Sequence, residues 1–341
     1  EKKYMGIMKI LSAYKNSVSK AILSRIVYMD EDKLNKILQE LTSMRLIDEV
    51  VYDWGFSYSI NNVQLKKLIY YRIPKDEKED IHRNIAELLQ ECYTDNYEMV
   101  MEELIHHLVA SNQREKAINI ILNLVKKQNN LYGTKSLLLW EEAYEICKDI
   151  DISHKISILE ALGKIYYMRG KNDKALEIYE ELHKEGLKYN KLEYCVMANI
   201  GISETYLQIG LNLKALKKAK ETIDFARQIG YVRGIAESKL LYCKVLFFSN
   251  IMENIQEYLN EVKIFALENN IGEVFGNLYN LMGLYQYYIG NAEEAIGYYK
   301  KSIKYFHQYG RLIDSTRPMN NIALIYVVLG QYDNAMEYYQ N

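Results

Sequence analysis

Proline and paired cysteines are scarce in this sequence. Only Pro74 and Pro318 occur in 341 residues. Because proline removes a backbone donor and breaks helices, so few prolines favour a mostly helical fold. The cysteines form no CxxC pair, and we expect reduced, half-buried thiols of a cytosolic protein rather than disulfides. They stand far apart in the chain, at Cys92, Cys147, Cys195 and Cys243.

Long apolar runs and a strong net charge are missing as well. No run reaches the ~18 apolar residues that a membrane-spanning helix needs, and no signal peptide opens the chain. The formal net charge is -2, so no global field attracts nucleic acid or a membrane surface. These features predict a cytoplasmic protein without a membrane partner. The chain starts at Glu1 without Met and stops inside a helical pattern at Asn341, so we expect a piece of a longer protein.

Residues that can end a helix recur at a fixed spacing. Glycine and asparagine accept the left-handed conformation that a helix C-terminus commonly needs. From about residue 154, such a residue stands every twenty positions, which predicts helices near 17 residues separated by short turns. The positions are Gly170, Asn190, Gly210, Gly230, Asn250, Asn270, Gly290, Gly310 and Gly330.

Two such helices make a unit of forty residues with recurring small and aromatic positions. Small side chains on both helices let their axes approach closely, and the tyrosines around the crossing are expected to fill the core. The pattern of Gly163, Tyr166, Gly170, Ala175 and Tyr179 resembles the tetratricopeptide repeat. The usual period of that repeat is about 34, so a period of forty adds almost a turn to each helix.

The first ninety residues form a different unit. Three helices are predicted, beginning near Tyr4, at Ser19 as an N-cap, and at Asp30. A β-hairpin follows around Asp53-Trp54-Gly55. Three helices and a hairpin predict a winged helix. Acidic residues open the third helix and the hairpin carries no Lys or Arg, which opposes binding to phosphates. We therefore favour a docking role, with a DNA-binding regulator as an alternative.

The segment after the hairpin is similar to a known regulatory class. "FSYSINNVQLKKLIYYRIPKDEKEDIHRNIAELLQE" gives a helix, a proline and a long helix containing His82, and "ELIHHLVASNQREKAI" follows with His106 and His107. This order resembles the region behind the nucleotide-binding module of STAND-class signalling ATPases. In that class a winged helix connects the ATPase to a helical-repeat sensor. The chain departs from the class where a His-acid pair is common, since Asn61 and Asn62 stand there.

The predicted fold is all-α with a small β-hairpin wing near the N-terminus. An N-terminal winged helix over residues 1–74 is followed by connecting helices and atypical leading repeats over 75–153. Residues 154–341 form a right-handed α-solenoid of tetratricopeptide-like hairpins, truncated in its last repeat. The resemblance implies a linked or partner NTPase or output domain.

Motifs for catalysis or cofactors are weak. "YGTKS" at 132–136 has a Lys-Ser pair but too few glycines for a phosphate-binding loop. Glu-x-x-His occurs at Glu79/His82, Glu103/His106 and Glu180/His183. That spacing serves di-iron sites only when the pairs lie on facing helices, which a one-dimensional stack keeps apart. We expect surface pairs, no enzymatic activity, no cofactor and no metal.

The inner surface of a curved stack, lined by the first helix of each pair, is the predicted binding site. Amides on it would pair with a peptide backbone, and aromatic rings would hold its side chains. The expected ligand is a protein, a peptide or a small effector. A passive scaffold or homo-oligomer, with 32 tyrosines supplying contact area, is the other alternative. The inward-facing residues are predicted to be Lys164, Tyr167, Glu204, Lys244, Phe247, Asn277, Asn280, Tyr287, Arg317 and Asn320.

Overall fold

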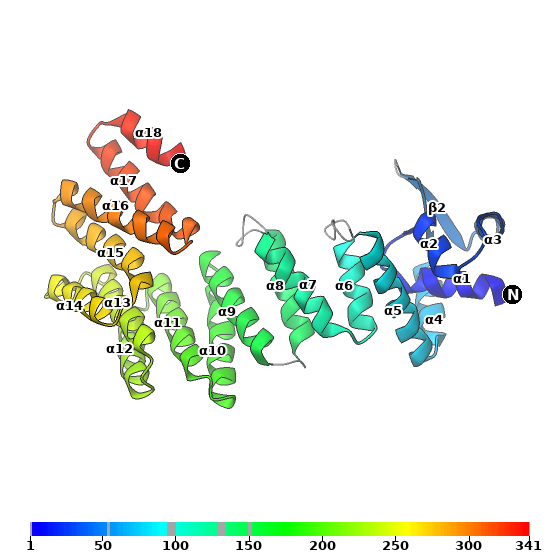
Figure 1. Cartoon of the computed structure of the whole chain (residues 1–341), viewed down its shortest axis with the longest axis horizontal. Coiled ribbons are helices and arrows are strands. Elements are labelled where there is room, and N and C mark those ends of the chain that lie inside the picture. Colours follow the sequence, from blue (N-terminus) through cyan, green and yellow to red (C-terminus); the bar gives the residue numbers. More distant parts are fainter. Residues whose placement is uncertain (1, 53–54, 94–99, 128–133, 149–151, 341) are drawn as a thin grey trace. The chain divides into compact units, whose positions relative to one another are not determined.

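Two units make up the chain, and each is described separately. The computed structural model describes residues 2–52, 55–93, 100–127, 134–148 and 152–340. Unit 1 is Glu1–Lys155 and unit 2 is Ile156–Asn341. Both are mostly helical (Figure 1). Among the described helices, none combines the length and the apolar character needed to cross a membrane.

Unit 1 opens with three helices and a small sheet. These elements are α1 (Lys2–Ala13), β1 (Val18–Ser19), α2 (Lys20–Val27), α3 (Glu31–Ser43), β2 (Ile47–Tyr52) and β3 (Gly55–Ile60). The strands are antiparallel in the order β1-β3-β2, with Val18 opposite Tyr58 and Ile47 opposite Ile60. The three helices and the hairpin were expected, whereas β1 was not. Asp53 and Trp54 of the expected turn lie outside the described residues.

Local capping explains where several of these helices start. The Ser19 hydroxyl accepts a hydrogen bond from the Ile22 amide at 3.3 Å, as predicted for an N-cap. Asp30 precedes α3 but makes no side-chain cap bond. Asn62 caps α4 (Val63–Arg72) by accepting from the amides of Gln64 and Leu65 at 2.9 and 3.0 Å. The side chain of Thr134, another expected N-cap, lies outside the described residues.

Helices complete unit 1. They are α4 (Val63–Arg72), α5 (Lys75–Cys92), α6 (Met101–Ala110), α7 (Arg114–Lys127) and α8 (Thr134–Cys147). Pro74 stands directly before α5, where its missing N–H costs nothing. Asn112 turns the chain between α6 and α7 with a φ of 61°. Neighbouring helices α5 and α6 contact each other, as do α6 and α7.

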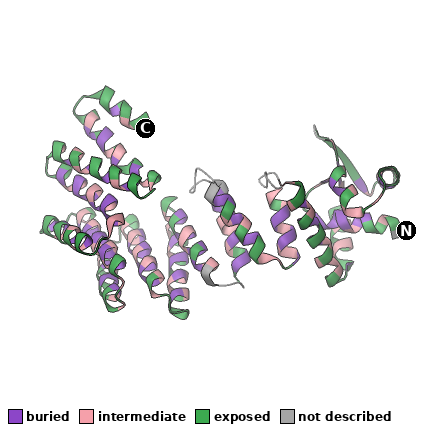
Figure 2. Cartoon of the chain, viewed as in Figure 1, coloured by how far each residue is buried: buried purple, intermediate pink, exposed green. Residues whose placement is uncertain are grey.

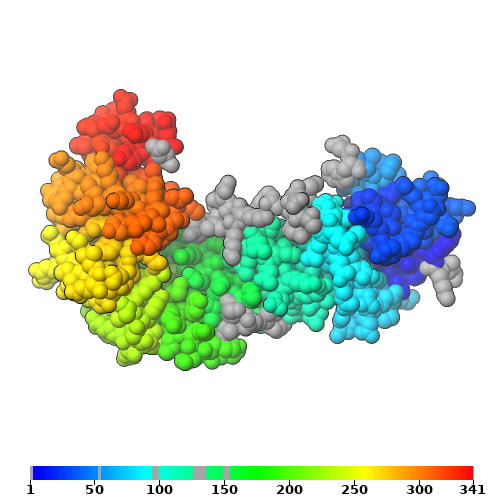
Figure 3. Space-filling model, in the orientation of Figure 1, coloured from blue at the N-terminus to red at the C-terminus, as the bar shows by residue number. Residues whose placement is uncertain are grey.

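Unit 2 is a series of helical hairpins that confirms the twenty-residue spacing. All nine glycine and asparagine positions have a positive φ, between 55° and 92°. In the space-filling view, successive hairpins lie against one another from green to red (Figure 3). The helices are α9 (Ile152–Met168), α10 (Asn172–Lys188), α11 (Leu192–Ile209), α12 (Asn212–Gln228), α13 (Val232–Phe248), α14 (Ile255–Glu268), α15 (Phe275–Tyr288), α16 (Ala292–Gln308), α17 (Leu312–Val328) and α18 (Tyr332–Gln340), with a short 3₁₀ helix at Gly272–Val274.

The small residues allow close approach between neighbouring hairpins. A Cβ on Gly163 would lie 2.5 Å from the ring of Tyr179, and a Cβ on Gly201 would lie 2.4 Å from the same ring. The buried Tyr179 of α10 therefore lies against both α9 and α11. Gly283 makes the same kind of contact with Tyr299. As predicted, these tyrosines fill the core, and buried positions recur along the helices from α9 to α17 (Figure 2).

Candidate functional site

The first helices of the hairpins form one layer of unit 2. Contacts join α11 to α13, α13 to α15, and α15 to α17, while each second helix contacts its flanking first helices. All ten residues predicted to bind a ligand lie on these first helices, from Lys164 on α9 to Asn320 on α17. We call the exposed side of this layer the inner face, because in a curved stack the layer whose members contact one another is the concave one.

Five of the ten predicted residues come together on the inner face. Lys244 of α13 donates to Glu204 of α11, with 2.7 Å between Nζ and Oε1, and each side chain keeps 29% of its exposure. Lys164 and Tyr167 of α9 and Arg317 of α17 interact electrostatically with this pair. We call these five residues the inner-face cluster. Four separate helices, from the first to the last hairpin of unit 2, contribute to it.

The charges in the cluster hold one another in the ionised state. Burial alone would raise the pKa of Glu204, but Lys244, followed by Arg317 and Lys164, outweighs burial and lowers this pKa. Burial would likewise lower the pKa of Lys244, yet the neighbouring Glu204 raises it. Burial, and then the charge of Glu204, raises the pKa of Tyr167, so its hydroxyl stays protonated at neutral pH.

Acidic residues at the edge of the cluster balance its cations. Arg317 forms an ion pair with Asp314 at 2.8 Å on its own helix. Glu160 of α9 interacts with Lys164, and burial is the main reason that the pKa of Glu160 is raised. The cations of the cluster thus lie near carboxylates, so the inner face offers charges of both signs.

Amide side chains form a second group on the inner face. Asn277 and Asn280 of α15 are half-buried, while Asn320 of α17 is exposed. The side chain that reaches Asn280 comes from Asn321, whose Nδ2 donates to Asn280 Oδ1 at 3.3 Å. Sequence reasoning missed Asn321, because helical spacing alone does not decide which of two adjacent asparagines turns toward the neighbouring helix.

The two predicted aromatic residues have different surroundings. Phe247 of α13 packs in part against the buried core between α13 and α15. Its ring also contacts Tyr288 edge-on, with centroids 5.9 Å apart. Tyr287 is 41% exposed. Phe247 therefore contributes to packing between repeats, and Tyr287 is the freer of the two rings.

A shallow pocket of unit 2 lies away from the predicted residues. Its volume is about 220 Å³, and it lies where the turns after α10 and α12 meet the following first helices. None of the ten predicted residues lines it. The lining residues are Asn190, Leu192, Glu193, Ile229, Gly230 and Tyr231.

The prediction that the Glu-x-x-His pairs lie on the surface is wrong for two of them. His82 is completely buried and His106 is half-buried in unit 1. Both contact His107, which is completely buried too. Sequence reasoning considered only pairs within one helix and helices far apart in the stack. It missed that α5 and α6 are neighbours, which brings residues 82, 106 and 107 together.

Comparisons with known proteins confirm the repeats. Residues 159–185 and 316–341 match models of the tetratricopeptide repeat. A search of curated proteins finds no significant match. Tetratricopeptide repeats are typical of modules that bind other proteins on an extended concave surface.

One solved structure of low sequence identity shares the fold, and two further structures are similar over much of this chain. Aspartyl phosphate phosphatase F from Bacillus subtilis is 12% identical, with a TM-score of 0.51 over 94% of this chain and 82% of that one. A STAND protein with a tetratricopeptide repeat sensor from Pyrococcus horikoshii is 14% identical, with a TM-score of 0.40 over 99% and 56%. The apo quorum sensor NprR from B. thuringiensis is 16% identical, with a TM-score of 0.45 over 94% and 95%. At these identities the likeness concerns the fold alone.

Proposed function

We propose that unit 2 is a sensor that binds an extended peptide segment, free or part of a protein, on its inner face. The chain would be a non-catalytic region of a regulatory protein, and binding would bias a linked ATPase or output domain. The observation that carries this proposal is the inner-face cluster. A ligand that contacts it engages α9, α11, α13 and α17 at once, so its binding energy acts on the curvature of the whole stack.

The chemistry of the inner face suits a peptide. Lys244 and Glu204 present charges of both signs, which can pair with the charged side chains or termini of a peptide. Asn277 and Asn280 can each donate to a backbone carbonyl and accept from a backbone amide. Tyr287 offers an exposed ring for an apolar side chain. A small effector would use only part of this surface.

The other predicted residues fit supporting roles in the same proposal. Lys164, Tyr167 and Arg317 would hold the Glu204–Lys244 pair in position, because each interacts with it electrostatically. Asn320 is exposed beside Asn321 and would extend the row of amides. Phe247 would support the ring of Tyr288 from the core side.

For unit 1 we propose that α1 to β3 form a winged helix that docks onto protein rather than DNA. The first turn of α3 carries Glu31 and Asp32, whose charges would repel phosphates. The hairpin instead exposes apolar side chains, including Val51 at 68% and Phe56 at 45%. Such side chains suit a protein surface.

Binding can be tested with a peptide library displayed on phage and panned against the purified chain. Selected peptides would then be titrated by fluorescence anisotropy. We expect Lys244→Met and the double variant Asn280→Ala with Asn320→Ala each to weaken binding at least tenfold. Lys217→Met and Asn334→Ala on second helices are matched controls and should change nothing. Circular dichroism would verify that helicity is kept.

Two results would count against this function. The first is that the selected peptides bind every variant with unchanged affinity, which would place the site away from the inner face. Alternatively, panning could enrich no sequence at all, while sedimentation shows self-association with rising concentration. That outcome would favour the scaffold or homo-oligomer instead.

A further inference from the structure

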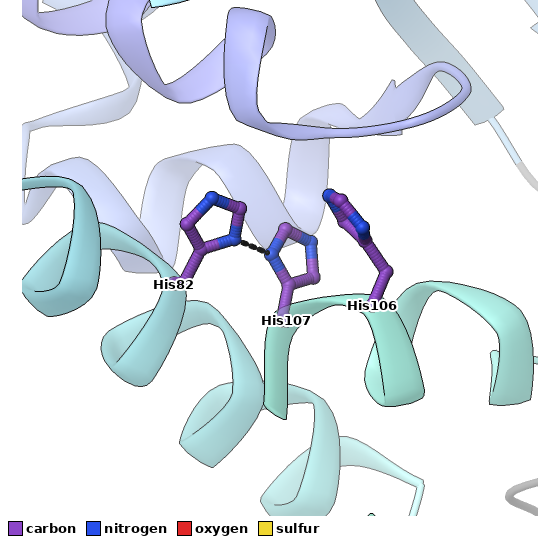
Figure 4. Close-up of side chains that lie close together, drawn as sticks. All are labelled: His82, His106 and His107. Atoms are coloured by element: carbon purple, nitrogen blue, oxygen red, sulfur yellow. Dashed lines mark hydrogen bonds between the residues drawn. The ribbon is translucent and has the colours of Figure 1, made fainter. Parts of the chain in front are cut away.

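Three histidine side chains converge inside unit 1. His82 projects from α5, and His106 and His107 project from α6 (Figure 4). We call them the histidine cluster. The centroids of the three rings are 4.9 to 5.3 Å apart. Buried polar rings in such close contact need partners for their nitrogens, so the partners of each ring are considered in turn.

The Nε2 atom of each ring faces a fixed oxygen. His106 Nε2 lies 3.2 Å from the carbonyl oxygen of Ala13. Because a carbonyl only accepts hydrogen bonds, this nitrogen carries the hydrogen, and His106 Nδ1 keeps its lone pair. His82 Nε2 lies 2.9 Å from the hydroxyl of Tyr70. His107 Nε2 faces Glu103 Oε2 at 3.6 Å.

The Glu103 carboxylate is itself held in place. It accepts from the backbone amides of Lys15 and Asn16 at 3.1 and 2.8 Å. Metal-binding histidines commonly direct their second nitrogen toward a carboxylate, a carbonyl or another oxygen, which fixes the ring and its tautomer. His82 and His106 have such an oxygen within hydrogen-bond distance, and His107 has the Glu103 carboxylate nearby, at 3.6 Å.

On the other side, the rings bring nitrogens together. His82 Nδ1 and His107 Nδ1 share a hydrogen bond at 2.7 Å (Figure 4), so one of the two carries a hydrogen that must move to Nε2 before both can ligate an ion. One ligand nitrogen from each of the three residues lies within 4.8 Å of the other two. Bonds of 2.0–2.1 Å to a tetrahedral ion place ligand nitrogens about 3.3 Å apart. The short pair must open by about 0.6 Å, and the longest separation must close by about 1.5 Å. Rotations of the three side chains about their χ angles would have to supply both changes.

Two buried polar atoms beside the cluster point to a ligand. His107 Nε2 and the hydroxyl of Tyr14 have no hydrogen-bond partner among the described residues. The ring of Tyr14 packs edge-on against His107, with centroids 4.8 Å apart. An ion on His107 Nδ1 would polarise the Nε2 hydrogen toward Glu103.

The charge state of the rings suits metal binding. Burial lowers the pKa of His82 to about 4, and burial lowers the pKa of His106 and, more strongly, that of His107. A metal ion would bind the neutral form of each ring. Lys15 and Lys78 add positive charge nearby, and the Glu103 carboxylate offsets part of it.

The geometry points to a binding site for a divalent late transition-metal ion of the zinc type, with His82, His106 and His107 as its ligands. Imidazole nitrogens suit zinc, copper, nickel and iron. Three protein ligands leave one position of a tetrahedral ion for water. The site joins α5 to α6 and is independent of the peptide proposal, which concerns unit 2 alone.

Cobalt(II) and zinc(II) serve as probes on the untagged, chelator-treated chain. We expect one Co²⁺ per chain with the visible spectrum of a tetrahedral ion, displaced by Zn²⁺. His106→Gln and His82→Gln should each weaken binding at least tenfold, and Glu103→Gln should weaken it by about 10- to 100-fold. His183→Gln is the matched control in unit 2 and should bind as the original chain does.

Some results would overturn the site. One is the absence of stoichiometric binding. Another is binding that His82→Gln and His106→Gln leave unchanged, or that His183→Gln abolishes as well. If the buried variants fail to fold, X-ray absorption on the zinc-loaded original chain decides instead. Three imidazole ligands support the site, and a shell without imidazole refutes it.

Discussion

Replacing glycine by alanine inside two helices of unit 2 should change stability in opposite directions. Gly201 of α11 is buried, and a Cβ there would lie 2.4 Å from the ring of Tyr179. Ordinary contacts begin near 3.4 Å, so the ring must move by about 1 Å. Tyr179 has little room to move, since Gly163 lies against the same ring. Overpacking of this kind costs about 1–3 kcal/mol.

Gly297 of α16 is the matched control. It is exposed, and no atom lies within 4 Å of where its Cβ would be. Alanine in a helix is favoured over glycine by roughly 0.5–1 kcal/mol. Gly297→Ala should therefore stabilise unit 2 by about that amount. The same gain offsets part of the clash at Gly201, so Gly201→Ala should destabilise by about 1–2 kcal/mol.

Urea unfolding followed by two probes measures these effects. The only tryptophans of the sequence, Trp54 and Trp140, both fall in unit 1. Tryptophan fluorescence thus follows unit 1, while far-ultraviolet circular dichroism follows the helices of both units. We expect Gly201→Ala and Gly297→Ala to shift the circular dichroism transition in opposite directions and to leave the fluorescence transition in place.

A double-mutant cycle tests the cause. In a Tyr179→Leu background, the smaller side chain should remove most of the cost of Gly201→Ala. Equal shifts for Gly201→Ala and Gly297→Ala would refute the packing argument. So would a cost at Gly201 that stays the same when Tyr179 is replaced.

Three further predictions concern turns, charges and hydrogen bonds of unit 2. Gly230→Ala should destabilise by about 1 kcal/mol, because φ is 67° there, whereas Asn190→Gly should leave the unfolding midpoint equal or slightly higher. Glu204 has a lowered pKa in the folded state, so its charge stabilises the fold above its unfolded pKa of about 4.3 and that contribution is lost as the pH falls through the folded value. Lys244→Met should therefore cost about 1 kcal/mol or less at pH 7, and progressively less as the pH is lowered, by urea midpoints measured at a series of acidic pH values. Ser302→Ala should lower the free energy of unfolding by about 1 kcal/mol, since the buried hydroxyl donates to the Gly276 carbonyl at 2.6 Å. An unchanged urea midpoint would show that this bond contributes nothing.

The helix ends of unit 2 could be predicted from the sequence because their cause is local. A left-handed residue at a helix C-terminus needs glycine or asparagine, and this preference does not depend on distant contacts. The small residues that recur at equivalent positions of the forty-residue units could be recognised in the sequence for the same reason. The sequence also indicated which repeat is irregular. Ile255 stands where the other repeats have alanine, and α14 begins only at that residue.

The contacts between helices were harder to predict from the sequence. Helical spacing placed Lys164, Glu204 and Lys244 on one face, but only the packing of the hairpins shows that Arg317 reaches the same charges. The choice between Asn320 and Asn321 depends on a rotation of α17 that the sequence does not record. The histidine cluster depends on how α5 packs against α6, across a segment whose sequence contains no distinctive turn motif.

The regular reversal every twenty residues has a consequence for how such a protein can change in length. Every cut made at equivalent turns removes or adds a whole forty-residue block that carries its own helix-ending residues. Gly210 and Asn250 both have a left-handed backbone at a turn. If the segment between them were duplicated, each surface of the inserted block would pack against a surface like the one that its original contacts. The length of the stack can therefore change in steps of one block without a redesign of the core. Each added block would extend the inner face.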